Sequence, residues 1–174
     1  MSRSLGQIIG DGLRLSLGRA EHLLQDVTPN IFCRMASPGG ELIKSNHPAF
    51  LYGHMTLYAS RVVEMTNGQA PAVPDGFAER FAKGVECIDD IHGSIYPAMN
   101  VITECFFTHY QDALDAVTAA SDEVLSQPNL AGGTITETFP TAGSMCNFLC
   151  CGHIMIHLGQ MSAWRRMQGL GPAS

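Results

Sequence analysis

Residues 146–164 read CNFLCCGHIMIHLGQMSAW, and they set the organisation that we expect for the whole chain. His153 and His157 stand four residues apart inside an apolar run. On an α-helix this spacing places both side chains on one face, with Cβ atoms about 5–6 Å apart, so two ring nitrogens can converge on one metal ion. The pattern predicts an amphipathic helix that turns its histidines toward neighbouring helices. The face continues in steps of three and four through Cys146, Cys150, His153, His157, Gln160 and Trp164.

The histidine pair does not by itself indicate a metal site. The chain has seven histidines, so a pair at this spacing also arises by chance. The residue after His153 is Ile154, whereas the HExxH motif of zinc proteases has a glutamate there as its general base. We therefore set protease chemistry aside and look for a third ligand.

Length and composition indicate a single domain that spans residues 1–174. Apolar residues make up 45% of the chain and charged residues 15%, which fits a folded protein with a large core. A chain of this length is too short for two ordinary domains. The net charge is −6 and the ten Lys and Arg residues form no cluster, so we expect no nucleic-acid or membrane partner. A small-molecule substrate is the partner that we expect.

The N-terminal segment and the cysteines predict a cytoplasmic protein. Residues 1–22 lack an uninterrupted apolar stretch and a small-residue cleavage site. No run of about 20 apolar residues occurs anywhere in the sequence. Three of the six cysteines lie within 146–164, and without an export signal we expect reduced thiols that mostly pack in the core.

Apolar periodicity predicts four long helices rather than alternating strands and helices. The first covers 4–26 with Ser4 as its N-cap, and its three glycines, at positions 6, 10 and 12, would let a neighbouring helix approach closely. The second begins at Pro48, capped by Ser45 or Asn46, and ends near Met65.

The second half of the chain holds the other two predicted helices. A long proline-rich crossover with a short helix at 76–88 leads to the third helix, over 97–126. A loop over 127–140 precedes the fourth helix, which Thr141 caps and Gly169 terminates. Four amphipathic helices with one long crossover describe an all-α four-helix bundle.

A third histidine lies on the inward face of the second predicted helix. Steps of three and four give His47, Leu51, His54, Tyr58, Arg61 and Met65. Bundle cores assemble metal sites from facing helices, so His54 is the natural partner of His153 and His157. Three neutral imidazoles would leave a coordination position open, as catalytic sites do. The alternative is three hydrogen-bonded histidines in a core that binds no metal.

These motifs resemble the DinB/YfiT-like superfamily of metal-dependent enzymes. Members of that superfamily carry W-x-x-G-H on helix two and H-x-x-x-H-x-G-Q on helix four. This chain has Tyr52-Gly53-His54 and then His153, His157, Gly159 and Gln160, with Phe50 and Leu51 in place of the tryptophan. The resemblance implies an up-down-down-up bundle with the crossover between helices two and three, frequent homodimers, and a metal bound by His54, His153 and His157.

The resemblance also implies a chemistry. Relatives include thiol-dependent S-transferases and isomerases that use low-molecular-weight thiols such as mycothiol, bacillithiol or glutathione. The metal would hold the thiol as the nucleophilic thiolate, or it would activate a bound water for hydrolysis. Ile154 stands where an acidic residue is common in the superfamily. We therefore favour thiol transfer or isomerisation over hydrolysis. Zinc, nickel and iron all suit imidazole. A bundle that binds a small ligand without catalysis is a further alternative.

Other side chains are assigned ligand-binding or structural roles. Gln160 could bind a ligand or bridge two helices, and Arg61 would pair with a core carboxylate or bind an anionic cofactor. His47 is expected to face solvent in the first helical turn, although it could line the site. Cys146 and Cys150 are expected to pack as small hydrophobes rather than act as ligands. No side chain is assigned as a catalytic acid or base.

A homodimer is predicted from apolar residues on the third helix. Ile102, Phe106, Phe107 and Leu114 exceed what one inward stripe can bury. Exposed apolar patches usually mark an interface.

Overall fold

In the computed structural model, which describes residues 2–173, regular secondary structure is helical, and no strand occurs within that range. The predicted all-α class is therefore confirmed. None of the described helices is long and apolar enough to cross a membrane. The elements in chain order are α1 (Leu5–Leu23), α2 (Pro29–Phe32), the 3₁₀ turn η1 (Pro38–Gly40), α3 (Pro48–Met65), α4 (Phe77–Phe81), α5 (Met99–Ala119), α6 (Asp122–Leu125), α7 (Thr134–Thr138), α8 (Ala142–Asn147), the π-helix η2 (Phe148–His153) and α9 (Ile154–Met167).

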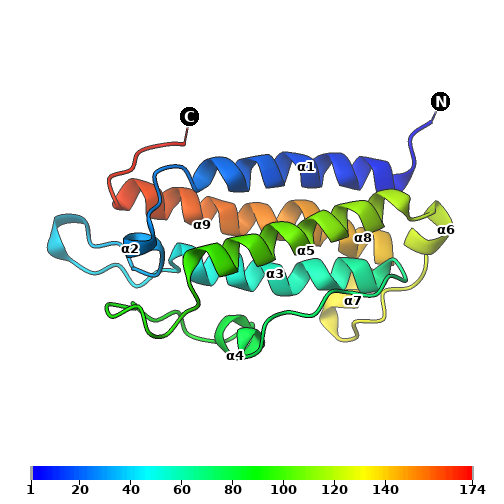
Figure 1. Cartoon of the computed structure of the whole chain (residues 1–174). Helices are drawn as coiled ribbons and strands as arrows, with labels where there is room; N and C mark the ends of the chain where they lie inside the picture. The colour runs from blue at the N-terminus through cyan, green and yellow to red at the C-terminus, as the bar shows by residue number, and fades with distance from the viewer. Residues whose placement is uncertain (1, 174) are drawn as a thin grey trace.

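The long helices α1, α3 and α5 and the continuous run α8–η2–α9 lie side by side (Figure 1). Helix α5 packs against both α1 and α3, and α9 packs against the same two helices. The colour gradient shows that α3 and α5 run in one direction and α1 and α9 in the other. The segment between α3 and α5 returns along the outside of the molecule and carries α4. Buried apolar side chains from these helices form one connected core.

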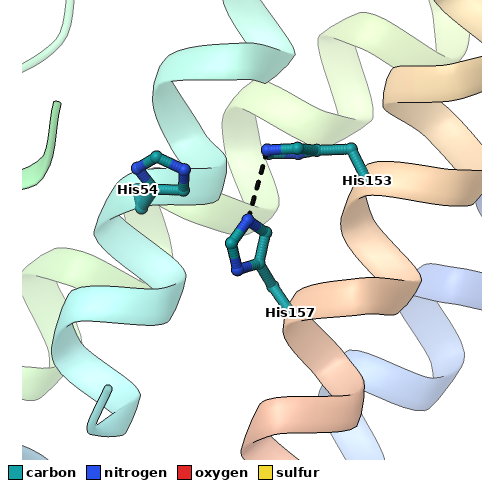
Figure 2. Close-up of side chains that lie close together, drawn as sticks. All are labelled: His54, His153 and His157. Carbon is teal, nitrogen blue, oxygen red and sulfur yellow. Dashed lines mark hydrogen bonds between the residues drawn. The ribbon is translucent and has the colours of Figure 1, made fainter. Parts of the chain in front are cut away.

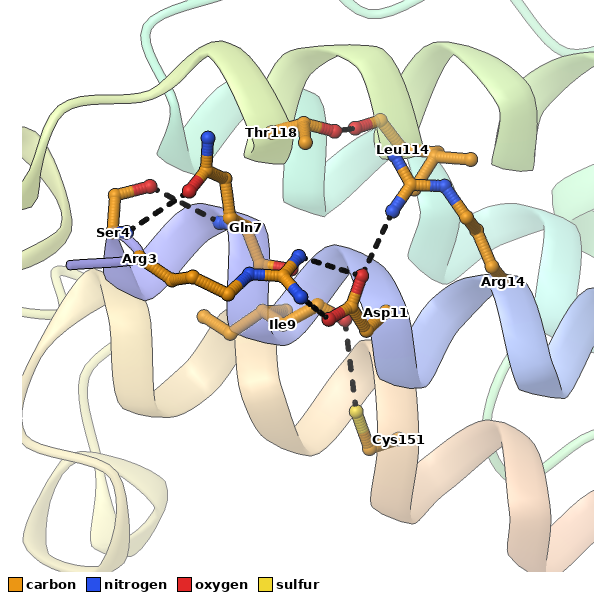
Figure 3. Close-up of polar contacts among 9 residues, drawn as sticks. All are labelled: Arg3, Ser4, Gln7, Ile9, Asp11, Arg14, Leu114, Thr118 and Cys151. Atoms are coloured by element: carbon orange, nitrogen blue, oxygen red, sulfur yellow. Dashed lines mark hydrogen bonds and ion pairs between the residues drawn. The ribbon is translucent and has the colours of Figure 1, made fainter. Parts of the chain in front are cut away.

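Helix α1 begins at a capping box and approaches its neighbours closely (Figure 3). The Ser4 side chain accepts from the Gln7 backbone N–H, and the Gln7 side chain accepts from the Ser4 N–H. A Cβ atom at Gly12 would lie 2.5 Å from Cys151 Sγ, and one at Gly6 would collide with the Val117 carbonyl. The predicted close approach is therefore confirmed at these two glycines. Arg3 and Arg14 pair with Asp11 on the exposed side of the helix, where ion pairs contribute little.

Two predicted helix boundaries in the first half of the chain are wrong. The cap of α3 is His47 and not Ser45 or Asn46, because the His47 side chain accepts from the Phe50 N–H. Helix α4 covers only Phe77–Phe81 of the predicted 76–88. Both differences concern the segments that flank the candidate site.

The third and fourth helices also differ from the prediction at their ends. Helix α5 ends at Ala119 because Ala120 is extended and the Ser121 side chain caps α6. Thr141 caps α8 as predicted. Gly169 has a positive φ of 78° beyond α9, and its N–H donates to the Arg166 carbonyl while the Leu170 N–H donates to Arg165. These two bonds form a Schellman motif.

The fourth helix contains the π-helix η2, and its predicted inward face is only partly buried. A π-turn holds more residues than an α-turn, and of the face predicted from α-helical spacing Cys146, Cys150 and Trp164 are buried. Beyond η2 the buried residues are Ile154, Leu158, Met161, Trp164 and Arg165. His153 and His157 lie half-buried at the edge of this face, and Gln160 is exposed. The prediction that Gln160 faces inward is wrong.

The apolar residues named for a homodimer are not exposed. Ile102, Phe106 and Leu114 are buried in the core, and Phe107 is half-buried. Large exposed apolar side chains occur instead on α1 and α9, which pack against each other, and include Leu5, Ile8, Leu15, Met155 and Ile156. The homodimer stays a prediction, and these two helices are the surface on which to test it.

Candidate metal centre

Three histidines from three helical segments converge at one point between α3 and α9 (Figure 2). His54 comes from the middle of α3, His153 ends η2, and His157 lies one turn into α9. One ring nitrogen of each lies within 4.8 Å of the others. Within residues 2–173 this is the one group of three or more histidine, cysteine or acidic side chains close enough to hold a metal ion.

The spacing of the helix-four pair matches the edge of a tetrahedral coordination sphere. The Nε2 atoms of His153 and His157 lie 3.2 Å apart. Two nitrogens bound to one zinc ion at about 2.0–2.1 Å with tetrahedral angles would lie about 3.3 Å apart. The His54 ring is somewhat more distant, with its centroid 5.6 Å from that of His153 and 4.9 Å from that of His157. The three rings therefore surround a common point rather than stack in a row.

The orientation of His54 is fixed by the backbone of the segment after α3. Its Nδ1–H donates to the Phe81 carbonyl oxygen at 2.7 Å. The proton is thereby assigned to Nδ1, and the lone pair of Nε2 is left free, which is the tautomer and the kind of outer hydrogen bond that metal-binding histidines have.

Gly53 explains how Phe81 comes so close to α3. A Cβ atom at position 53 would lie 2.6 Å from the Phe81 ring, so a larger residue would push α4 away. In the Tyr52-Gly53-His54 sequence, the candidate ligand His54 thus follows a glycine. The small size of this glycine lets Phe81, whose carbonyl accepts the His54 proton, come close to α3. This acceptor is a main-chain carbonyl, so no side-chain pattern could have identified it from the sequence.

The helix-four histidines are not satisfied by the protein alone. Their Nδ1 atoms are buried, and neither has a hydrogen-bond partner. The two rings bond to each other through their Nε2 atoms. A metal held by the two Nε2 atoms would keep a proton on each Nδ1 and would not supply these atoms with a partner, so the indication of a metal site is the convergence of the Nε2 atoms. The donor set fits a divalent transition metal, because neutral imidazole suits zinc, nickel and iron.

All three imidazoles are held in the neutral form that binds metals. Burial, together with the neighbouring His157 and His54, lowers the pKa of His153 to about 3. Burial, together with His54, lowers the pKa of His157 to about 4. Burial also lowers the pKa of His54, partly opposed by its bond to Phe81. At neutral pH a metal ion therefore competes with no proton at these nitrogens.

Aromatic side chains enclose the three histidines. The Tyr58 ring centroid lies 4.3 Å from that of His153 and 5.0 Å from that of His54. Phe50 stacks on His54 at 6.0 Å, and Phe148 meets His153 edge-on at 5.8 Å. Tyr58 lies on the predicted stripe with His54, but the spacing alone gave it no role. Its hydroxyl is a potential hydrogen-bond donor beside the site.

The two predicted cofactor-binding residues lie outside the histidine group. Gln160 accepts a hydrogen bond from Asn46 Nδ2 at 3.0 Å and so bridges α9 to the segment before α3. Arg61 is exposed, so the expectation that it faces the core is wrong; the next two residues, Val62 and Val63, take the buried face of α3. Ligand binding by either residue stays a prediction.

The remaining candidates have structural surroundings. His47 is fully buried, so the solvent-facing position predicted for it is wrong; capping α3 requires its ring to fold back onto the backbone. Cys146 and Cys150 are buried, and burial raises the pKa of each thiol. Neither belongs to the histidine group. Their surroundings match the predicted role as core side chains.

Comparison with known proteins assigns no family to this chain. No protein-family model matches it, and no curated protein is similar to it at a significant level. The function therefore has to be inferred from the histidine site and its surroundings.

Proposed function

We propose that His54, His153 and His157 bind one divalent transition metal ion and that the protein is a metal-dependent enzyme of the DinB/YfiT-like kind. The observation that carries the proposal is the convergence of three neutral, half-buried or buried imidazoles within 4.8 Å. The free Nε2 of His54 and the 3.2 Å separation of the Nε2 atoms of His153 and His157 support it. Zinc, nickel and iron are the candidate ions.

The arrangement of the helices supports the same proposal. A DinB-like bundle has an up-down-down-up course with its crossover between the second and third long helices. The directions of α1, α3, α5 and α9 in Figure 1 are compatible with that course, and the segment 66–98 supplies the crossover. The three histidines lie on the second and fourth long helical runs, as the motif of the superfamily requires.

The chemistry that we propose is thiol-dependent S-transfer or isomerisation. Three protein ligands leave room at the ion for a low-molecular-weight thiol as its thiolate or, in the alternative, for a water used in hydrolysis. The chain itself orients the imidazoles and shields them. The Phe81 carbonyl fixes the tautomer of His54, and the surrounding aromatic rings limit access of water to the imidazoles. No acidic side chain belongs to the group within residues 2–173, which favours a reaction in which the nucleophile needs no adjacent carboxylate base.

Elemental analysis of the purified protein tests the metal. We expect about one divalent transition metal per chain after purification or reconstitution. Less than a tenth of an equivalent after incubation with zinc, nickel and iron in turn would contradict the proposal. That result would favour the alternative of a non-catalytic bundle, in which the bonds from His54 to Phe81 and from His153 to His157 serve only the core.

Cobalt substitution tests the thiol chemistry. Addition of glutathione, bacillithiol or mycothiol to the cobalt-loaded protein should produce a sulfur-to-metal charge-transfer band. Absence of the band with all three thiols, in a protein that does hold cobalt, would move the proposal to hydrolysis. The metal site and the reaction are thus tested separately.

We further propose a cytoplasmic homodimer that acts on a small molecule and binds neither nucleic acid nor membrane. Light scattering at micromolar concentration should give twice the chain mass of 18.7 kDa. Ile156→Glu on α9 should return the protein to one chain mass, because a charge in an apolar interface is not tolerated. A single-chain mass for the wild-type protein would refute the dimer.

A further inference from the structure

Three side chains of α9 hold the segment between α2 and α3 against this helix. The indole N–H of Trp164 and the side-chain amide of Gln168 donate to main-chain carbonyls of that segment, at 2.8 Å and 3.4 Å. Gln160, one turn before Trp164, bonds to the Asn46 side chain at 3.0 Å. The three residues are spaced four positions apart, so they lie along one edge of the helix.

Gln160 differs from the other two because it uses its oxygen and not its N–H. Asn46 Nδ2 donates to Gln160 Oε1, so the orientation of the Gln160 amide is set by a neighbour that offers a proton. A carbonyl oxygen has two lone pairs, and Asn46 uses one of them. The same oxygen can therefore accept a proton from one more donor.

The His157 ring has a nitrogen that needs such an acceptor. Its Nε2 atom faces His153 at 3.2 Å, and its second nitrogen lies on the side of the ring away from His153 (Figure 2). This Nδ1 atom is buried and has no hydrogen-bond partner. A metal ion at Nε2 requires the ring proton on Nδ1, where a buried donor without an acceptor is unfavourable.

Gln160 is positioned to accept this proton. It follows His157 by three residues, a spacing that makes two helical side chains neighbours, and a helical side chain lies over the turn before its own Cα. Asn46 directly precedes the cap of α3, so it holds the amide on the side of α9 that His157 shares with His54. Because Gln160 is exposed, its side chain is free to turn toward the ring.

The acidity of His157 agrees with this placement. Burial, followed by the charge of His54, lowers the pKa of His157 to about 4, and the Gln160 side chain opposes the shift. An oxygen that accepts a ring proton favours the protonated ring and has this effect.

We propose that Gln160 is a positioning residue whose Oε1 atom accepts the Nδ1 proton of His157, with Asn46 fixing the orientation of the amide. Gln160 then does for His157 what the Phe81 carbonyl does for His54. The gain in metal affinity rests on the proposed function. The position of the proton does not, because both side chains belong to the metal-free protein.

The proposal also assigns the proton between the two histidines of the fourth helix. Two Nε2 atoms 3.2 Å apart form a hydrogen bond only if one of them carries a proton. A neutral His157 with its proton on Nδ1 has none on Nε2, so the shared proton belongs to His153. The metal-free protein should therefore contain His157 protonated at Nδ1 and His153 protonated at Nε2.

Long-range proton–nitrogen correlation spectra of the metal-free protein at neutral pH distinguish these tautomers. Gln160→Met keeps the length of the side chain without its amide, and both tautomers of His157 should then be populated. Gln168→Met is the matched control, because Gln168 ties the same segment to α9 two turns further along. A wild-type His157 protonated at Nε2, unchanged tautomers in Gln160→Met, or an equal change in Gln168→Met would overturn the proposal.

Competition of the zinc-loaded protein with a chelator of known affinity measures the effect on the metal. Gln160→Met should weaken zinc binding about 10–100-fold, as loss of an outer hydrogen bond does, and Gln168→Met should leave it unchanged. Gln160→Glu, whose carboxylate still accepts the proton, should bind zinc at least as tightly as the wild type. Wild-type affinity in Gln160→Met, or equal weakening in Gln160→Glu or Gln168→Met, would overturn the positioning role.

The two measurements separate this inference from the metal. If the tautomers respond to Gln160→Met as expected but the wild-type protein retains no zinc, the proton assignment stands and the proposed function fails. If zinc binds equally well to the wild type and to Gln160→Met, the metal site stands and the role of Gln160 fails.

Discussion

His47 and His54 lie two turns apart on α3, and both are buried, yet their surroundings differ. Both ring nitrogens of His47 are used: Nδ1 accepts from the Phe50 N–H at 3.2 Å, and Nε2 donates to the Ile88 carbonyl at 3.0 Å. His54 uses only Nδ1, in its bond to Phe81, and its other nitrogen faces two histidines that are themselves incompletely bonded. The hydrogen bonds of His47 account for its burial, whereas the three converging rings have nitrogens free for a metal ion.

This difference separates the two histidines more clearly than burial or acidity does. Burial lowers the pKa of His47 to about 4, much as it lowers the pKa of His157. What distinguishes His47, the cap of α3, from the candidate ligands is the number of ring nitrogens that lack a hydrogen-bond partner. The predictions below test that distinction, in decreasing order of the effect expected on metal binding.

The largest effect should come from removing a ligand. His54→Ala or His157→Ala should reduce bound metal from about one equivalent to less than a tenth, because two imidazoles without a third hold a divalent ion weakly. Helical circular dichroism should persist, since the core is mostly apolar. His22→Ala, on the exposed side of α1, is the matched control and should retain full stoichiometry. Retention of metal by either ligand variant would show that the assignment of the three histidines is wrong.

A second effect should come from the glycine that admits Phe81. In Gly53→Ala the added Cβ meets the Phe81 ring, so the carbonyl that orients His54 should move away. Loss of such an outer hydrogen bond lowers metal affinity about 10–100-fold. Gly159→Ala is the matched control, because a Cβ there meets no atom within 4 Å. Competition with a chelator of known affinity measures both variants, and equal affinities would contradict the role given to Phe81.

His47→Ala should leave metal binding intact and lower stability instead. The substitution removes the cap of α3, leaves the buried Phe50 N–H without a partner and frees the carbonyl of the exposed Ile88. We expect a loss of about 2–4 kcal/mol in the free energy of unfolding. Urea unfolding and elemental analysis on the same sample provide the test. Loss of metal in a protein that remains folded would place His47 in the site.

Acidification should destabilise the metal-free protein. The folded-state pKa values of His47, His153 and His157, about 4, 3 and 4, lie below the ordinary value of 6.5. The unfolded chain therefore binds more protons between these limits, and stability present above pH 6.5 is lost as the pH falls toward 4. A decrease of at least about 2 kcal/mol from pH 7 to pH 4 is expected in urea unfolding. Stability that is constant or rises over this range would contradict the buried, neutral state of these rings.

The sequence predicted the convergence of His54, His153 and His157 because helical spacing is a local property. His153 and His157 are separated by four residues and so share a face wherever a helix forms, and Gly53 and His54 fall in a helix with a clear apolar pattern. The caps Ser4 and Thr141 were predictable for the same reason, since capping depends on residues three positions apart.

What the sequence did not predict depends on contacts between distant segments. The π-helix Phe148–His153 carries no distinctive residue pattern, and Gln160, beyond it on α9, is exposed. The burial of His47 depends on Ile88, and the orientation of His54 depends on Phe81; both acceptors are main-chain carbonyls in the crossover.

X-ray absorption spectroscopy of the zinc-loaded protein tests the central claim most directly. Three histidine ligands predict scattering from about three imidazole nitrogens at about 2.0–2.1 Å, and His54→Ala should reduce that number in any zinc that remains bound. A sulfur shell at about 2.3 Å would place the metal on cysteines instead. That result, or a zinc-loaded protein with fewer than two imidazoles at the ion, would contradict a site built from His54, His153 and His157.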